Sequence, residues 1–121
     1  MTDRSALDIA RAYHAAWSTG DFTAATQLLA DDLAVEVPIN EYPTKESFAA
    51  ALAAFAGMTS SVRVLSELGD GSEAMVLYDM SVDGLGTLRV AEHFTVADGA
   101  IVRLRQIHDT HALRAAGVGA R

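Results

Sequence analysis

The apolar residues of this chain recur at helical spacing in its first half and alternate with polar residues in its second half. The helical spacing predicts a helix over residues 5–18, a second helix capped by Asp21, and a third that begins at Thr44 and ends at Gly57. A short strand, Leu33–Val37, is expected between the second and third helices, because a proline closes an apolar run there.

After residue 61 the period of the apolar residues becomes two, which is typical of half-buried strands. Four strands are predicted in this half: Val62–Leu68, Glu73–Val82, Thr87–Ala97 and Ala100–His108. The dipeptide Asp98-Gly99 between the last two suits a two-residue type I′ turn. This order of elements predicts an α+β fold, a cone-shaped roll in which three N-terminal helices pack on a strongly curved, mainly antiparallel sheet and enclose a pocket.

Alternation also assigns each strand residue to one face of the sheet. In the last strand the residues expected to face the helices are Val102, Leu104, Gln106 and His108. In the two strands before it the same face is apolar and includes Tyr78 and Met80, but it also includes Glu92. A carboxylate among apolar side chains is costly unless it has a partner, so Glu92 marks a candidate site.

The outer face of the sheet is expected to mix apolar residues with charges of both signs. Its members would be Met75, Leu77, Asp79, Arg89, Ala91, His93, Thr95, Arg103 and Arg105. Such a face is more apolar than contact with water requires, so we expect a homodimer that buries sheet against sheet. The alternative is an open sheet face crossed by salt bridges.

Length and composition narrow the class of protein. The 121 residues are expected to form one domain, residues 1–121, and half of them are hydrophobic, as in globular proteins. The chain has no cysteine, which excludes disulfides and thiolate nucleophiles and fits the cytoplasm. The formal net charge of -7 argues against nucleic-acid or anionic membrane partners, and no apolar run approaches the ~20 residues of a membrane span.

Glu92 is the clearest candidate for chemistry. A carboxyl in an apolar pocket has a raised pKa and can serve as a general acid, a general base or a neutral hydrogen-bond donor. The structural alternative is that it only bonds Tyr13, Tyr78 or a helix terminus. Tyr13, on the apolar side of the first helix, either aims its hydroxyl at a ligand oxygen or is part of the core.

The end of the last strand offers a second pair of candidates. Alternation turns His108 inward and Asp109 away from it, and Asp109 is favoured as the N-cap of a short tail helix at residues 110–116. His14 and His111 are expected to be exposed, and the histidine spacing indicates no metal site. No glycine-rich phosphate or dinucleotide loop is present, so no cofactor is expected.

Several short segments, taken in order, carry a resemblance to a known family. They are Ala12-Tyr13, Ser18-Thr19-Gly20-Asp21-Phe22, Leu29-Ala30-Asp31-Asp32, Val35-Glu36-Val37-Pro38, Glu92-His93-Phe94, Asp98-Gly99 with Ile101, His108-Asp109-Thr110 and Leu113-Arg114-Ala115-Ala116-Gly117. Over nearly its whole length the chain resembles the nuclear transport factor 2-like superfamily, in its SnoaL-like polyketide cyclase and ketosteroid isomerase-like branch. The resemblance implies the same fold but no single activity, because the branch holds isomerases, cyclases, epoxide hydrolases, dehydratases and non-catalytic modules.

The resemblance also implies roles for single positions. Tyr13 matches the oxyanion-hole tyrosine of ketosteroid isomerases, and Glu92 matches the protonated carboxylic acid of that hole. Val37 stands where those enzymes carry their general-base aspartate, so their usual mechanism is not expected here. Asp109 matches a carboxylate that ends the last strand in many SnoaL-like members and is a candidate acid or base there, but a β-bulge would be needed to turn it inward.

These observations together predict a cofactor-independent acid/base enzyme of the isomerase, cyclase, hydratase or hydrolase-type lyase kind, acting on a small apolar oxygen-bearing molecule. Its catalytic candidates are Glu92, Tyr13, His108 and Asp109. Its ligand-binding candidates are Trp17, Val37, Phe55, Tyr78, Met80 and Gln106. The alternative is a non-catalytic module that binds a small ligand or dimerises. The loop at residues 39–43 is either a lid of the pocket or a simple connection.

Overall fold

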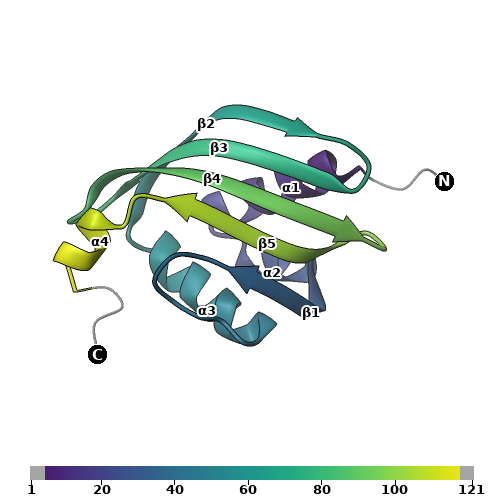
Figure 1. The fold of residues 1–121 in the computed structure, drawn as a ribbon, viewed down its shortest axis with the longest axis horizontal. Helices are drawn as coiled ribbons and strands as arrows, with labels where there is room; N and C mark the ends of the chain where they lie inside the picture. The colour runs from purple at the N-terminus through teal and green to yellow at the C-terminus, as the bar shows by residue number, and fades with distance from the viewer. Residues whose placement is uncertain (1–4, 118–121) are drawn as a thin grey trace.

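The structure is a computed structural model that describes residues 5–117 of the chain. Its elements follow the predicted order, helices first and then mainly strands (Figure 1). The helices are α1 (Ala6–Ser18), α2 (Phe22–Gln27), α3 (Lys45–Ala56) and α4 (His111–Ala115). The strands are β1 (Leu29–Glu36), β2 (Thr59–Gly69), β3 (Glu73–Val82), β4 (Gly86–Ala97) and β5 (Ala100–His108).

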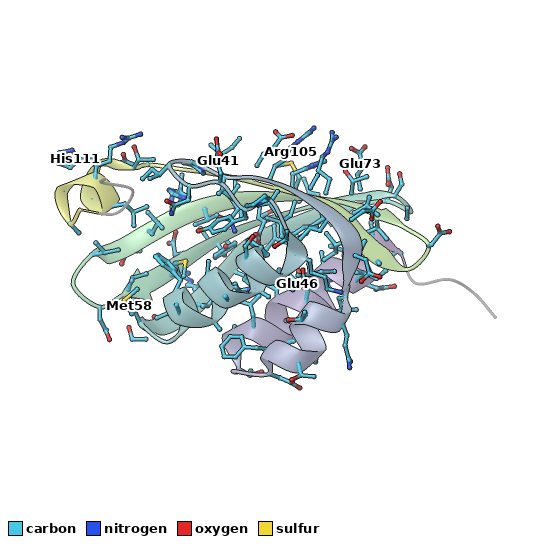
Figure 2. All side chains as sticks on the ribbon, turned by 90° about the horizontal axis from the view of Figure 1, so that it is seen from below. Glu41, Glu46, Met58, Glu73, Arg105 and His111 are labelled. Carbon is cyan, nitrogen blue, oxygen red and sulfur yellow. The ribbon has the colours of Figure 1, made fainter. Side chains whose placement is uncertain are left out.

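The strands form one curved sheet of five, in the order β1-β5-β4-β3-β2 (Figure 1). Strands β2 to β5 pair antiparallel as predicted, whereas β1 runs parallel to β5 and makes the sheet mixed. Helices α1, α2 and α3 lie together on one side of the sheet (Figure 2). The predicted α+β fold, with helices packed on a curved and mainly antiparallel sheet, is confirmed.

The helix that bounds the site, α3, begins and ends at the predicted residues. The Thr44 side chain accepts a hydrogen bond from the Ser47 amide at 3.0 Å, and the Ser47 hydroxyl accepts one from the Thr44 amide at 3.1 Å. This reciprocal pair is a capping box, which satisfies amides that the first helical turn leaves free. Gly57 ends the helix. None of the helices in residues 5–117 is long and apolar enough to cross a membrane.

A β-bulge changes the predicted face of one residue in β5. The pairing of β4 with β5 shifts between Thr95, which lies opposite Arg103, and Val96, which lies opposite Ile101. Val102 is therefore the extra residue of the bulge, and Ile101 takes the inward place that simple alternation gave to Val102. Because Ile101 is fully buried and Val102 is not, the prediction for Val102 is wrong.

Helix α1 is buried over a wider face than its apolar spacing indicates. His14 is only 4 % exposed, and its ring lies against Trp17 and Tyr78 with centroid distances of 4.9 and 4.3 Å. The prediction that His14 is exposed is wrong, because α1 contacts four strands, β2 to β5, of a sheet that curves around it. Burial lowers the pKa of His14 to about 4, so this ring is neutral at physiological pH.

The capping box of α3 leads to a prediction about stability. Thr44→Ala removes the acceptor of the Ser47 amide and is expected to lower the free energy of unfolding by about 1 kcal/mol. Thr110→Ala is the control, because Thr110 is the N-cap of α4 and makes no side-chain cap hydrogen bond. Its hydroxyl accepts a hydrogen bond only from the exposed Arg114 side chain, at 3.2 Å. Urea denaturation followed by circular dichroism measures both losses. A loss as large for Thr110→Ala as for Thr44→Ala would contradict the role of the capping box.

Candidate functional site

An apolar cavity of about 130 Å³ lies between the concave face of the sheet and α3. Strands β3, β4 and β5 form its floor, while α3 and the segment at residues 37–42 form its opposite wall. Helix α3 contributes the large side chains Phe48 and Phe55 but also the small Ala51 and Ala56. The small side chains leave space that larger ones would fill, so the cavity follows from the alanine-rich sequence of α3.

The cavity brings together most of the residues that the sequence singled out. It is lined by all six ligand-binding candidates, Trp17, Val37, Phe55, Tyr78, Met80 and Gln106. It is also lined by Glu92 and His108, but not by Tyr13 or Asp109. Contact between any of these residues and a ligand stays a prediction.

Glu92 is the most unusual group in the cavity wall. It is 1 % exposed, and its Oε2 accepts a hydrogen bond from the Gln106 amide at 2.6 Å. Gln106 stands directly opposite it in the register of β4 and β5. Burial raises the pKa of Glu92 to about 7, although nearby Gln106 and Tyr78 act in the lowering direction. A sizeable fraction of this carboxyl is therefore protonated near neutral pH.

The Gln106 hydrogen bond decides where the proton of the neutral acid sits. Because Oε2 accepts from the amide of Gln106, the proton of the protonated form belongs on Oε1. Oε1 is buried and has no hydrogen-bond partner. Buried polar atoms are rarely left without a partner. Oε1 of the protonated acid is therefore a candidate donor to a group in the cavity, although the Tyr78 hydroxyl is also close enough to act on this carboxyl.

His108 is half-buried at the end of β5, on the same face as Glu92. Its Nδ1 lies 3.0 Å from the backbone oxygen of Asp109. A carbonyl oxygen only accepts, so Nδ1 carries the proton in this hydrogen bond, and Nε2 of the neutral ring is left as a proton acceptor. Glu92 supplies a donor, and His108 supplies an acceptor beside it.

The other two catalytic candidates lie outside the cavity. Tyr13 is fully buried, its ring packs edge-on against Phe94, and its hydroxyl has no hydrogen-bond partner. Burial raises the pKa of Tyr13, and the nearby Glu92 carboxylate adds to this effect. Asp109 is exposed, and its side chain accepts a hydrogen bond from the His111 amide at 3.0 Å at the start of α4.

The loop after β1 is the part of the wall that sequence reasoning left open. Pro38, Ile39, Asn40 and Tyr42 all line the cavity, so this loop is more than a connection. Ile39 has a φ of 77°, which is rare for a β-branched residue and holds its side chain against the cavity at some cost in backbone strain. The signal available in the sequence was the presence of two large apolar side chains, Ile39 and Tyr42, in a short loop.

Within residues 5–117, no group of three or more His, Cys, Asp or Glu side chains is arranged to hold a metal ion.

Helices packed on the concave face of one mixed sheet, with a cavity between them, make up the fold of the nuclear transport factor 2-like proteins. The chain belongs to the SnoaL-like domain family, which matches it over residues 10–104. Among curated proteins, none matches the sequence.

Three solved structures illustrate the similarity. A protein from Kribbella flavida DSM 17836 is 34% identical, with a TM-score of 0.88 and 93% of each chain covered. A nuclear transport factor 2-like protein of unknown function from Cytophaga hutchinsonii ATCC 33406 is 18% identical, with a TM-score of 0.82 and coverage of 93% of this chain and 97% of that chain. A second Kribbella flavida DSM 17836 protein, provisionally named a ketosteroid isomerase, is 20% identical, with a TM-score of 0.77 and coverage of 86% and 77%.

Glu92 makes the stability of the protein depend on pH in a defined direction. Its folded-state pKa of about 7 lies above the reference value of 4.5, so between these values the folded protein holds a proton that the unfolded chain has lost. The stability linked to this group is fully present below pH 4.5 and is lost as the pH rises through about 7. Because each pKa unit is worth about 1.4 kcal/mol, the total loss is about 3 kcal/mol.

We therefore expect Glu92→Gln to gain stability relative to the wild type as the pH rises from 4.5 to above 7. Urea denaturation of both proteins at each pH measures the difference in free energy of unfolding. Taking the difference removes the contribution of His14, whose lowered pKa of about 4 gives the opposite slope in an overlapping range. Parallel curves for the two proteins would show that Glu92 has an ordinary pKa.

Proposed function

We propose that this protein is a cofactor-independent acid/base enzyme that acts on a small apolar molecule bearing an oxygen, held in the cavity beside Glu92. The observation that carries the proposal is the buried Oε1 of Glu92, which has no hydrogen-bond partner among residues 5–117. Burial also raises the pKa of Glu92 to about 7, so the acid is partly protonated near neutral pH. The reaction is of the isomerase, cyclase or hydratase type. The cysteine-free sequence supports a place in the cytoplasm.

The chemistry is a proton transfer next to a polarised oxygen. The protonated Oε1 of Glu92 donates a hydrogen bond to the carbonyl oxygen of the ligand, and Nε2 of His108 removes a proton from the neighbouring carbon. The electron pair of the broken C–H bond forms the enol double bond, and its negative charge is stabilised on the oxygen that Glu92 holds. Reprotonation at carbon by His108 restores a ketone, and attack of the enol on a second carbonyl gives an aldol-type ring closure.

The size of the cavity limits the ligand. An apolar cavity of ~150 Å³ in another protein holds one benzene ring, and the cavity here has about 130 Å³. A molecule with one six-membered ring fits this space, whereas four fused rings do not. Val37 stands where ketosteroid isomerases carry their base, and it is apolar and lines the same cavity. Steroid isomerisation is therefore a less suitable function for this protein than a reaction on a one-ring molecule.

The alternative function is a non-catalytic module that binds a small ligand in the same cavity. It is favoured by Val37 and by the exposed position of Asp109, which leave His108 as the one proton acceptor beside Glu92 that lines the cavity among residues 5–117. A binder and an enzyme both need Oε1 as a donor. They differ in whether a proton leaves the ligand's carbon, and this difference can be measured.

The proposal predicts exchange of hydrogen for deuterium next to the carbonyl of cyclohexanone. In D₂O the wild-type protein is expected to accelerate this exchange, and Glu92→Gln and His108→Ala are each expected to reduce the acceleration by about 100-fold, since a general acid or base contributes at least this much. Proton NMR follows the loss of the α-proton signal.

Glu46→Gln is the matched control for this experiment. It makes the same carboxyl-to-amide change at an exposed position of α3 (Figure 2) that does not line the cavity, and it is expected to keep the wild-type rate. Binding of cyclohexanone without exchange in the wild type would favour the binding module. Unchanged exchange in both site variants would overturn the assignment of Glu92 and His108.

We also propose that two copies of the chain pair through the outer face of the sheet. An apolar stripe crosses this face, formed by Leu68, Met75, Leu77, Ala91 and Ile107, with Leu68 and Ile107 exposed by 71% and 70%. Charges of both signs stand on either side of the stripe, among them the pairs Arg89–Asp79 and Arg105–Glu36. Because these charges are already paired within the chain, the apolar stripe is the part of the face that a second copy would cover.

The stripe predicts a dimer that a single charge disrupts. Ile107→Lys is expected to convert the wild-type dimer to a monomer in sedimentation velocity, because the charge would be buried without a partner. Met58→Lys is the matched control and is expected to stay dimeric, since Met58 is also exposed, by 44%, but lies away from the outer face (Figure 2). A monomeric wild type, or an Ile107→Lys variant that stays dimeric, would overturn this interface.

A further inference from the structure

A second cavity, which we call the α1–β2 groove, lies on the concave face of the sheet between α1 and the edge strand β2. Its volume is about 280 Å³, and among residues 5–117 it shares no lining residue with the cavity beside Glu92. Helix α1 lines it with one stripe of side chains spaced three and four residues apart, which includes Arg11, His14 and Ala15. Strand β2 lines it with Val62, Val64 and Glu67.

A β-bulge turns the carboxylate of Glu67 into this groove. The pairing of β2 with β3 shifts between Val64 and Ser66, so Leu65 is the extra residue. Glu67 therefore takes the inward place that simple alternation would give to Ser66. Arg11 meets it from α1, with its Nε 3.1 Å from Oε1 of Glu67. The bulge thus puts an ion pair at one end of the groove.

The rest of the groove is apolar. Val62 and Val64 form its floor on β2, and Val64 is 43% exposed although it stands opposite Tyr78 on the concave face. Ala15 lines the same groove and is too small to cover this floor. An apolar cavity of ~150 Å³ holds one benzene ring, so a volume of about 280 Å³ has room for a ring with a polar substituent.

His14 separates the groove from the cavity beside Glu92. It lines the groove, while its ring packs on Trp17 and Tyr78, which both line the other cavity. Its lowered pKa of about 4 leaves the ring neutral at physiological pH. Among residues 5–117, the charges that line the groove are therefore those of Arg11 and Glu67, and they balance.

We propose that the α1–β2 groove is a second binding site, which takes a small neutral carboxamide attached to an apolar ring. The oxygen of the carboxamide accepts a hydrogen bond from the guanidinium of Arg11, and its NH₂ group donates to the carboxylate of Glu67. Glu67 would repel an anion and Arg11 would repel a cation, whereas a neutral amide suits both members of the pair. The ring covers the exposed side of Val64. The site is independent of the proposed function, because it uses none of the residues assigned to that reaction.

The charge preference of the groove is tested with three probes that share one ring. Benzamide is neutral, benzoate is an anion and benzamidine is a cation at neutral pH. Each is titrated into ¹⁵N-labelled protein, and binding is followed on the backbone amide signals of Val62 and Val64. Benzamide is expected to bind about 10-fold more tightly than either charged probe, the worth of one charge-assisted hydrogen bond. Equally tight binding of benzoate or benzamidine would overturn the ligand class.

The location of the site is tested by filling the groove from α1. Ala15→Leu places a larger side chain over Val64 at an exposed helical position that leucine suits, and it is expected to weaken benzamide binding by at least about 10-fold. Ala54→Leu is the matched control, because Ala54 is an exposed alanine of α3 that lines neither cavity. Wild-type binding in Ala15→Leu would overturn the site.

The ion pair is tested by Glu67→Gln. This variant is expected to weaken benzamide binding by about 3- to 10-fold and to tighten benzoate binding, because the charged acceptor is lost and the repulsion of the anion with it. An unchanged preference between the two probes would overturn recognition by the ion pair. Glu92→Gln is expected to bind benzamide as the wild type does. A loss in that variant would place benzamide in the other cavity and overturn the second site, whereas the deuterium exchange of cyclohexanone tests the proposed function separately.

Discussion

The placement of one carboxyl group in the apolar face of the sheet constrains much of this structure. An ionised carboxylate at the position of Glu92 would be costly because little water reaches it, and no cation among residues 5–117 shifts its pKa. The fold instead supplies the amide of Gln106 on the neighbouring strand and the nearby Tyr78 hydroxyl, which both act to lower the pKa of Glu92, and leaves Oε1 without a close hydrogen-bond partner among residues 5–117. Burial therefore raises the pKa of Glu92 to about 7, and the carboxyl is partly protonated near neutral pH. We expect this arrangement to cost stability relative to an apolar residue, and in the proposed function it provides a donor at the cavity wall.

The cavity itself arises from how the two layers fit together. The sheet curves around α1, which buries even His14, while α3 faces the sheet with alanines at positions where larger residues would close the gap. The loop after β1 completes the wall, with Ile39 held at a positive φ. The cavity, the Glu92 carboxyl and the strained loop at Ile39 thus lie together. In a protein that needed only stability, each of the three would be removed by a common substitution.

The sequence predicted those parts of the fold that depend on local pattern. The bounds of β3 and β5 match the prediction, Thr44 and Gly57 bound α3 as expected, and the Asp98-Gly99 turn has both residues at positive φ, at 52° and 77°. The parts it missed depend on partners distant in the chain. Strand β1 begins four residues before the predicted Leu33, at Leu29, because it pairs in parallel with β5. The bulge at Val102 and the burial of His14 likewise follow from the curvature of the whole sheet.

For the site, alternation was enough to place Glu92, Gln106, Tyr78 and His108 on one face, because period two is strict between bulges. It could not tell that Tyr13 would be buried behind the cavity wall. Whether Tyr13 lines the cavity or lies behind its wall depends on how closely α1 packs on the sheet, and the spacing of apolar residues in the sequence does not specify this packing. The family resemblance could not report it either, because matching residue types do not fix the wall of a cavity.

The position of the proton acceptor sets a limit on the reaction. In an enzyme with a base at Val37, acid and base would face each other across the ligand, and a proton could move between distant carbons. Here Val37 is apolar, and His108 stands on the sheet beside Glu92, as a diagonal neighbour on the same face about 7–8 Å away by general sheet geometry. In the proposed reaction both groups would therefore act on one end of a bound molecule. This arrangement favours proton removal from the carbon next to the bound oxygen, as in enolisation and aldol-type closure, over transfer of a proton along the length of a ring system.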